Sequence, residues 1–133
     1  MIFIDSNIPM YAAGREHQNR QPALTFLSKV RRGEIEVCTS TEVLQEILYR
    51  YRALGRLDLA FEVYDLFVAL CPAVLPVTLA DTDRARELLE QVDGLGVRDA
   101  IHAAVALGQE MSLVATFDQA FDRVPGLARI PLS

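Results

Sequence analysis

Short apolar runs, each about the length of a β-strand, alternate along this chain with longer segments of helical periodicity. The expected strands cover residues 1–5, 34–38, 73–77, 112–116 and 128–130. The expected helices cover residues 7–13, 22–32, 39–54, 81–91 and 97–109, with one more that runs from Gly55 to about Leu70. Such alternation predicts a mostly parallel α/β sheet with helices on both faces, whose functional residues gather at the carboxyl ends of central strands.

Length and composition predict one domain over residues 1–133. Hydrophobic residues make up 51% of the chain and charged residues 23%, which is typical of a globular protein. The longest apolar stretch, Leu66–Val77, is interrupted by Pro72 and Pro76 and is too short to span a membrane. The first residues include no basic segment and reach Asp5 at once, unlike a secretory signal. We therefore expect a cytoplasmic protein with no membrane association.

The cysteines and the charge balance exclude other classes. Cys38 and Cys71 form no C-x-x-C pair, so we expect buried free thiols rather than a zinc or redox site. The 13 basic and 18 acidic residues give a net charge of −5, so the whole chain lacks a basic nucleic-acid footprint. Eight basic residues do fall between Arg15 and Arg56, although interleaved acids favour an ordinary solvated surface there.

Two aspartates stand at the carboxyl ends of expected strands. Asp5 ends the run MIFID, and Asp118 comes after LVATF. A carboxylate at the tip of a buried strand needs a hydrogen-bonding partner, water or a metal, because its desolvation is costly. The alternative is a capping role, for Asp5 at the helix that begins with Asn7 and for Asp118 at the turn 119–123.

The expected helix 39–54 offers two glutamates one turn apart. Thr39 and Glu42 match a capping box, which would give Glu42 a structural role. Glu46 lies closer to the apolar stripe and is the better candidate for a functional site. An ion pair between Glu46 and Arg50, one turn later, is the structural alternative.

The expected helix 97–109 is apolar on nearly all sides, so its polar residues stand out. Asp99 in its first turn is either functional or a complement to the helix dipole. His102 shares the side of Asp99 and is a candidate to touch a substrate phosphate or to orient a carboxylate, unless it is simply packed. Arg98 is a second candidate for substrate binding.

Four carboxylates, on Asp5, Glu46, Asp99 and Asp118, thus fall at strand ends or on the helical turns that follow. A parallel sheet brings such positions together, and clustered carboxylates favour a hard cation such as Mg²⁺ or Mn²⁺. A metal of this kind can activate water against a phosphodiester, so the pattern predicts hydrolysis of nucleic acid.

Four segments resemble motifs of the PIN-domain nucleases, and among them of the VapC-like toxins of type II toxin–antitoxin pairs. MIFIDSNI resembles the opening strand, with its acid at Asp5 and a hydroxyl residue at Ser6. TSTEVLQEIL places the second acid at Glu46, and RDAIHAAVAL places the third at Asp99. ATFDQAF places Thr116 and Asp118 at the pocket. Four motifs in this order and spacing cover nearly the whole chain.

The resemblance implies a three-layer α/β/α PIN-like fold and an Mg²⁺-dependent endoribonuclease, in which Mn²⁺ can replace Mg²⁺. It implies a homodimer and a VapB-like antitoxin whose C-terminal segment covers the active site. Asp5 and Asp99 would hold the metal, and Glu46 and Asp118 would bind or order its waters, with Ser6, Asn7 and Thr116 in support. Many members carry a further aspartate where this chain has Ala120, so we expect at least one metal ion.

Three other functions are compatible with acids clustered at strand ends. A phospho-receiver domain needs a lysine near the last motif, but the only lysine is Lys29. A haloacid-dehalogenase-type phosphatase needs an aspartate where Asn7 stands. The remaining alternative is a catalytically silent PIN-like module that binds RNA or a protein, which the intact set of four acids disfavours.

Overall fold

The computed structural model describes residues 1–133 as five strands, six α-helices and one 3₁₀ helix. The strands are β1 (Ile2–Ile4), β2 (Val37–Ser40), β3 (Ala73–Leu75), β4 (Leu113–Ala115) and β5 (Ala128–Arg129). The helices are α1 (Asn7–Ala13), α2 (Arg20–Arg31), α3 (Thr41–Ala53), α4 (Leu57–Leu70), α5 (Leu79–Gln91), α6 (Val97–Gly108) and η1 (Gln119–Arg123). Each expected element is present, with its ends displaced by a few residues at most.

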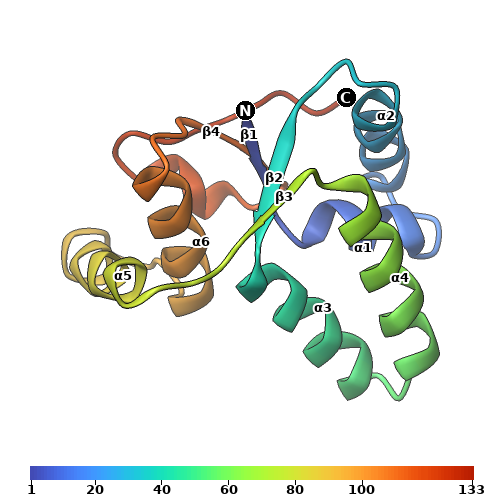
Figure 1. Ribbon diagram of the computed structural model, residues 1–133, viewed down its shortest axis with the longest axis horizontal. Coiled ribbons are helices and arrows are strands. Elements are labelled where there is room, and N and C mark those ends of the chain that lie inside the picture. Colours follow the sequence, from blue (N-terminus) through green and yellow to red (C-terminus); the bar gives the residue numbers. More distant parts are fainter.

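The strands form one sheet in the order β3-β2-β1-β4-β5, and all neighbours are parallel. Helices α5 and α6 lie on one side of the strands, while α1, α2 and α4 lie on the other (Figure 1). The three-layer α/β/α architecture is therefore confirmed. The chain winds outward from β1 to β3 and then returns to place β4 on the other side of β1, which makes the β1–β4 junction a topological switch point.

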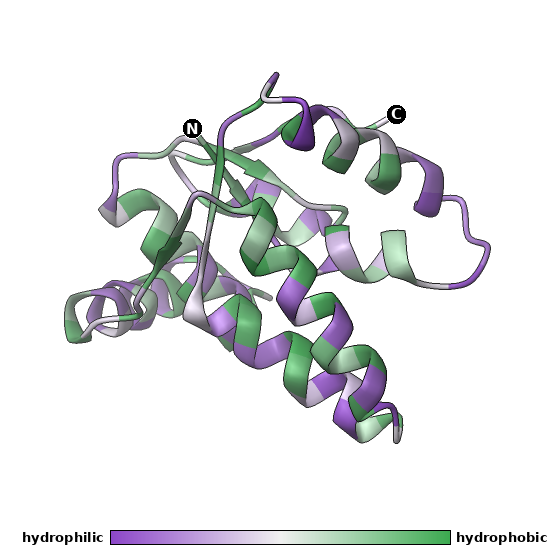
Figure 2. Ribbon diagram, turned by 45° about the vertical axis from the view of Figure 1, so that its right-hand side comes forward, coloured by the Kyte–Doolittle hydropathy of each residue, from purple (hydrophilic) through white to green (hydrophobic).

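The core lies between the sheet and its two helical layers. Phe3 and Ile4 of β1 are fully buried, as are Ala100, Ala103 and Ala104 of α6. These alanines let α6 approach the sheet closely. In Figure 2 the strands are green, whereas the outer helix α5 carries many purple residues. The two cysteines are buried and free, as predicted, and no helix has the length and apolar character that a membrane span requires.

Strand β2 and helix α3 differ from expectation at their junction. Thr39 and Ser40 are strand residues paired with Val74 and Leu75 of β3, so α3 begins only at Thr41. The Thr39 hydroxyl donates to the carbonyl of Ile4 at 3.1 Å instead of capping the helix. The predicted capping box of Thr39 and Glu42 is therefore wrong, because extension of the sheet takes priority over an earlier start of the helix.

A capping box does exist at α5, where it was not predicted. The Thr78 hydroxyl accepts from the amide of Asp81 at 3.3 Å, and the Asp81 carboxylate accepts from the amide of Thr78 at 2.9 Å. The sequence places the start of this helix at Asp81, but Asp81 stands in the first turn and Thr78 is the N-cap. The reciprocal pair fixes where α5 begins.

We expect Phe3→Ala to lower the free energy of unfolding by about 3–5 kcal/mol, because it removes a fully buried ring from the central strand. Phe61→Ala is the matched control, since the Phe61 side chain is 56% exposed on α4 and should change stability by no more than about 0.5 kcal/mol. Urea unfolding of the three proteins measures both changes. Equal losses in the two variants would contradict this assignment of the core.

Candidate active site

A pocket of about 520 Å³ opens at the carboxyl ends of β1 and β4, the switch point of the sheet. Four carboxylates line it, those of Asp5, Glu46, Asp99 and Asp118. Asp5 follows β1, Asp118 follows β4, Glu46 comes from α3 and Asp99 from the first turn of α6. The four acids singled out in the sequence therefore meet in one cavity.

Asp5 is only 4% exposed and is held by several donors. Its Oδ1 accepts from the amide of Ser6 at 2.7 Å, and its Oδ2 accepts from the Thr116 hydroxyl at 2.8 Å. The Asn7 amide donates to the same Oδ2 at 3.3 Å and to the Thr116 hydroxyl at 3.0 Å. The backbone amide of Asp5 continues the sheet by donating to the carbonyl of Ala115 at 3.0 Å. Ser6, Asn7 and Thr116 thus fix the orientation of this carboxylate.

Glu46 is also buried, at 5% exposure, but it is surrounded by cations. Arg50 and Arg98 lie 3.0 Å and 3.3 Å from its Oε2, and His102 Nε2 lies 3.2 Å from its Oε1. Burial raises the pKa of Glu46, but His102 and Arg50 lower it more, to about 2. The expected helical ion pair with Arg50 therefore forms, and it forms inside the candidate site.

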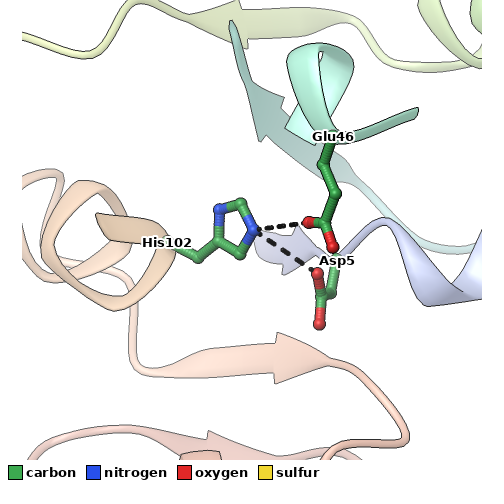
Figure 3. A group of neighbouring side chains, drawn as sticks. All are labelled: Asp5, Glu46 and His102. Atoms are coloured by element: carbon green, nitrogen blue, oxygen red, sulfur yellow. Dashed lines mark hydrogen bonds and ion pairs between the residues drawn. The ribbon is translucent and has the colours of Figure 1, made fainter. Parts of the chain in front are cut away.

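His102 is fully buried beneath the pocket. Its Nε2 faces Glu46 and lies 3.7 Å from Asp5 Oδ1, as Figure 3 shows. Burial lowers the pKa of His102, but the neighbouring carboxylates raise it by more. The His102 side chain has no exposed surface in this structure, so contact with substrate would need the pocket floor to open. Its position instead fits the other expectation, that it orients a carboxylate.

Asp99 has the opposite environment to Glu46. No hydrogen bond or ion pair joins it to a basic side chain, and it lies beside Asp118 and Asp5. Burial and these neighbouring carboxyl groups together raise the pKa of Asp99 to about 7. Burial also raises the pKa of Asp5, despite the donors around it. Asp5 and Asp99 therefore keep their protons to a higher pH than an ordinary aspartate does.

Asp118 has the expected capping role and also reaches the pocket. Its Oδ1 accepts from the amide of Ala120 at 2.9 Å and so caps η1, while the residue also lines the pocket. The Ala120 side chain offers no ligand. Arg98, the other candidate for substrate binding, is partly exposed beside Glu46, and its guanidinium carbon lies 5.6 Å from the centre of the Tyr49 ring.

Comparison with known proteins decides the family. The PIN domain profile matches residues 2–127. The chain belongs to the PIN-domain family. Ribonuclease VapC13 of Mycobacterium tuberculosis is 36% identical to it over 130 residues, which cover 98% of this chain and 99% of the relative.

Solved structures share the fold of this PIN domain at lower sequence identity. The toxin VapC20 of Mycobacterium tuberculosis, described as cleaving the sarcin-ricin loop, has a TM-score of 0.75 at 21% identity, covering 90% of this chain and 91% of its own. VapBC2 of Rickettsia felis, bound to a promoter DNA fragment, has a TM-score of 0.73 at 20% identity and covers 98% of both chains.

The chemistry of the pocket suits a divalent cation. Three aspartates, Asp5, Asp99 and Asp118, supply hard oxygen donors, and their unbalanced charge is what a cation would neutralise. Asp5, Glu46 and His102 also lie close enough to share an ion, with one ligand atom of each within 4.8 Å of the others. In that group, however, Glu46 is already paired with three basic side chains. The aspartate side of the PIN-domain pocket therefore fits a metal better.

Several pocket residues were missed in the sequence. Tyr11, Asn19 and Phe117 line the cavity together with Arg50, which was noted only as a partner for Glu46. Tyr11 stands four residues after Asn7, so helical periodicity places the two on one face of α1. That spacing could have identified Tyr11. No local pattern places Asn19 in the pocket, because it lies just before α2 and reaches the cavity through the tertiary fold.

We expect Asp99→Asn to stabilise the metal-free protein at pH 8. The folded-state pKa of Asp99 is raised to about 7, so the wild type loses stability as the pH rises from about 4 through 7. The asparagine variant lacks this loss. After allowance for solvent screening, the difference should be about 1–2 kcal/mol at pH 8 and should vanish near pH 4.

Urea unfolding in EDTA at pH 4, 6 and 8 measures this difference. Asp93→Asn, at an exposed position after α5, serves as the matched control and should show no such trend. A stability difference between Asp99→Asn and wild type that does not change with pH would rule out charge repulsion at Asp99.

Proposed function

We propose that this protein is a metal-dependent endoribonuclease that hydrolyses phosphodiester bonds of RNA. The observation that carries the proposal is the convergence of Asp5, Asp99 and Asp118 on one pocket, in which no basic side chain pairs with Asp99. The near full-length similarity to a VapC ribonuclease supports RNA as the substrate. We further propose a role as the toxin of a type II toxin–antitoxin pair.

In this proposal Asp5 and Asp99 hold Mg²⁺, and Asp118 and Glu46 bind or order water around it. Mn²⁺ has the same preference for oxygen ligands and can replace Mg²⁺. When bound, the ion supplies neutralisation of phosphodiester charge and a water of lowered pKa. In-line attack by water leaves a 5′-phosphate and a 3′-hydroxyl.

The chain's own contribution is to fix these acids. Ser6, Asn7 and Thr116 leave Asp5 little rotational freedom. His102 and Arg50 hold Glu46 from opposite sides of its carboxylate, on Oε1 and Oε2. Such fixed geometry is what positions water and substrate with little reorganisation. A silent RNA- or protein-binding module, the alternative function, has no need of acids constrained in this way.

We expect the purified protein to cleave total cellular RNA with Mg²⁺ or Mn²⁺ and not with EDTA. Asp5→Asn should reduce the rate by more than about 100-fold, because loss of even an outer partner of a metal ligand costs about 10- to 100-fold. Asp93→Asn should cleave like the wild type. Gel electrophoresis and sequencing of the cut ends measure rate and site.

RNA with a blocked 2′-hydroxyl tests the nucleophile. Attack by water predicts continued cleavage of this RNA, whereas a strict requirement for the 2′-hydroxyl would indicate attack by that group. Absence of cleavage by a folded protein in every metal would favour the silent module. Cleavage that persists unchanged in EDTA would contradict the metal requirement.

An apolar groove supports a protein partner. It has a volume of about 610 Å³ and lies among α1, α2 and α4, with Leu24, Leu27, Leu66 and Phe67 in its lining and Arg31 as its one polar residue. We propose that an apolar segment of a VapB-like antitoxin occupies it. The toxin–antitoxin complexes among the structural neighbours support this partner.

We propose that the protein acts in the cytoplasm. An RNA substrate and two buried free thiols are consistent with that compartment.

We also propose a homodimer, with exposed apolar side chains of α5 and α6 as the candidate contact. Leu79 is 77% exposed, Val97 64% and Leu89 37%. Light scattering coupled to gel filtration measures the mass in solution and so distinguishes dimer from monomer.

We expect the protein encoded by the gene immediately upstream to co-purify with this chain. The substitution Leu66→Arg should reduce the yield of this complex by at least about 10-fold. The reason is that an arginine at this position puts an unpaired charge into an apolar interface. Leu66 is 66% exposed, so the free protein should still fold. The control is Leu54→Arg, at a 71% exposed position outside the groove lining. Equal recovery with both variants would exclude the groove as the docking site.

A further inference from the structure

We infer that Tyr11, Phe117 and Asn19 form a subsite for one unpaired nucleobase beside the acids of the pocket. All three line the same cavity as Asp5, Asp99 and Asp118. The inference rests on the proposed ribonuclease function, because it places a base of the substrate next to the phosphodiester that the acids would face. It extends that function by assigning RNA without base pairing at this point.

Tyr11 and Phe117 form an aromatic wall of the pocket. Both lie next to residues that orient Asp5. Tyr11 lies one helical turn after Asn7 on α1, and Phe117 follows Thr116 directly. The amide of Phe117 donates to Asn7 Oδ1 at 3.3 Å. Because Asn7 also donates to Asp5, a base held on this wall would have a fixed position relative to the acids.

The two rings hold each other in place. Their centroids are 5.3 Å apart and their planes meet at 82°, an edge-to-face arrangement. Both side chains are only partly buried, and they line a mostly polar cavity rather than the centre of the core. The rings therefore leave apolar surface facing a site whose other walls are charged, which is the combination that a nucleotide matches.

A planar heteroaromatic ring already lies against Tyr11. The His17 ring is 4.7 Å from the Tyr11 ring, centre to centre, and the planes are inclined by 32°. His17 is exposed, and it lies in the connection between α1 and α2. The contact shows that a face of Tyr11 is accessible to a ring of this shape, and an exposed side chain can move aside for a base.

Polar groups around the rings suit the rest of a nucleotide. The Asn19 side-chain amide lines the cavity and makes no hydrogen bond within the chain, so its donor and acceptor are free to pair with a base edge. Arg50, with a 54% exposed side chain, lines the same cavity and offers a cation for the adjoining phosphate. Stacking, edge pairing and phosphate binding thus come from separate parts of the chain.

The test is the binding of a ten-nucleotide single-stranded RNA with a central 2-aminopurine, whose fluorescence falls when the base stacks. We would measure it with Mg²⁺ in an Asp5→Asn background, so that the RNA stays intact. We expect Tyr11→Leu to weaken binding by about 5- to 100-fold and to remove the quenching. Tyr11→Phe should retain both, and Asn19→Ala should weaken binding without removing the quenching.

The matched control is Phe61→Leu, which removes an exposed aromatic ring outside this pocket and should leave binding and quenching unchanged. Thermal unfolding of each variant shows whether it is folded. Unchanged binding and quenching in a folded Tyr11→Leu variant would overturn the inference, as would equal binding of the same strand in a perfect duplex.

The outcomes separate this inference from the proposed function. If wild type cleaves RNA but Tyr11→Leu binds and quenches as before, the subsite is wrong and the ribonuclease stands. If the wild type never cleaves RNA but quenching depends on Tyr11, the base subsite stands and the silent RNA-binding module replaces the ribonuclease.

Discussion

Asp5 has to remain at the end of a buried strand, and most of the site is arranged around that requirement. A carboxylate with 4% exposure is costly to desolvate, and the cost is offset by donors from Ser6, Asn7 and Thr116. Thr116 reaches Asp5 because β1 and β4 are parallel neighbours, in a register that pairs Ile4 with Ala115. The order of the strands therefore also determines how the Asp5 carboxylate is held.

Two other acids of the pocket, Glu46 and Asp99, lie in opposite electrostatic environments. Glu46 is surrounded by Arg50, Arg98 and His102, and stays ionised with a pKa of about 2. Asp99 is surrounded by acids, and its pKa is raised to about 7. Two carboxylates of one site therefore differ in ionisation: Glu46 stays ionised beside basic side chains, whereas Asp99 keeps its proton up to about neutral pH. Pairs of titratable groups with divergent pKa values are common at functional sites.

Sequence patterns predicted the fold and the four acids well, because both depend on short-range regularity. Apolar runs identified every strand, and the spacing of Glu46 from the apolar stripe of its helix correctly placed it inward. The start of α3 was wrong because pairing of Thr39 and Ser40 with β3 is a long-range effect. The sequence left open whether His102 touches substrate or orients a carboxylate for the same reason: its partners, Glu46 and Asp5, lie on other elements.

The bond between Thr116 and Asp5 joins residues 111 positions apart in the chain. A nascent chain that extends only to the end of α6 lacks β4, Thr116 and Asp118, and so it lacks one of the three residues that donate to the Asp5 carboxylate. Closing so long a loop costs chain entropy that a local helix does not require. The pocket consequently cannot be complete before β4 has joined the sheet, and a chain whose synthesis stops short of the final motif has no complete site.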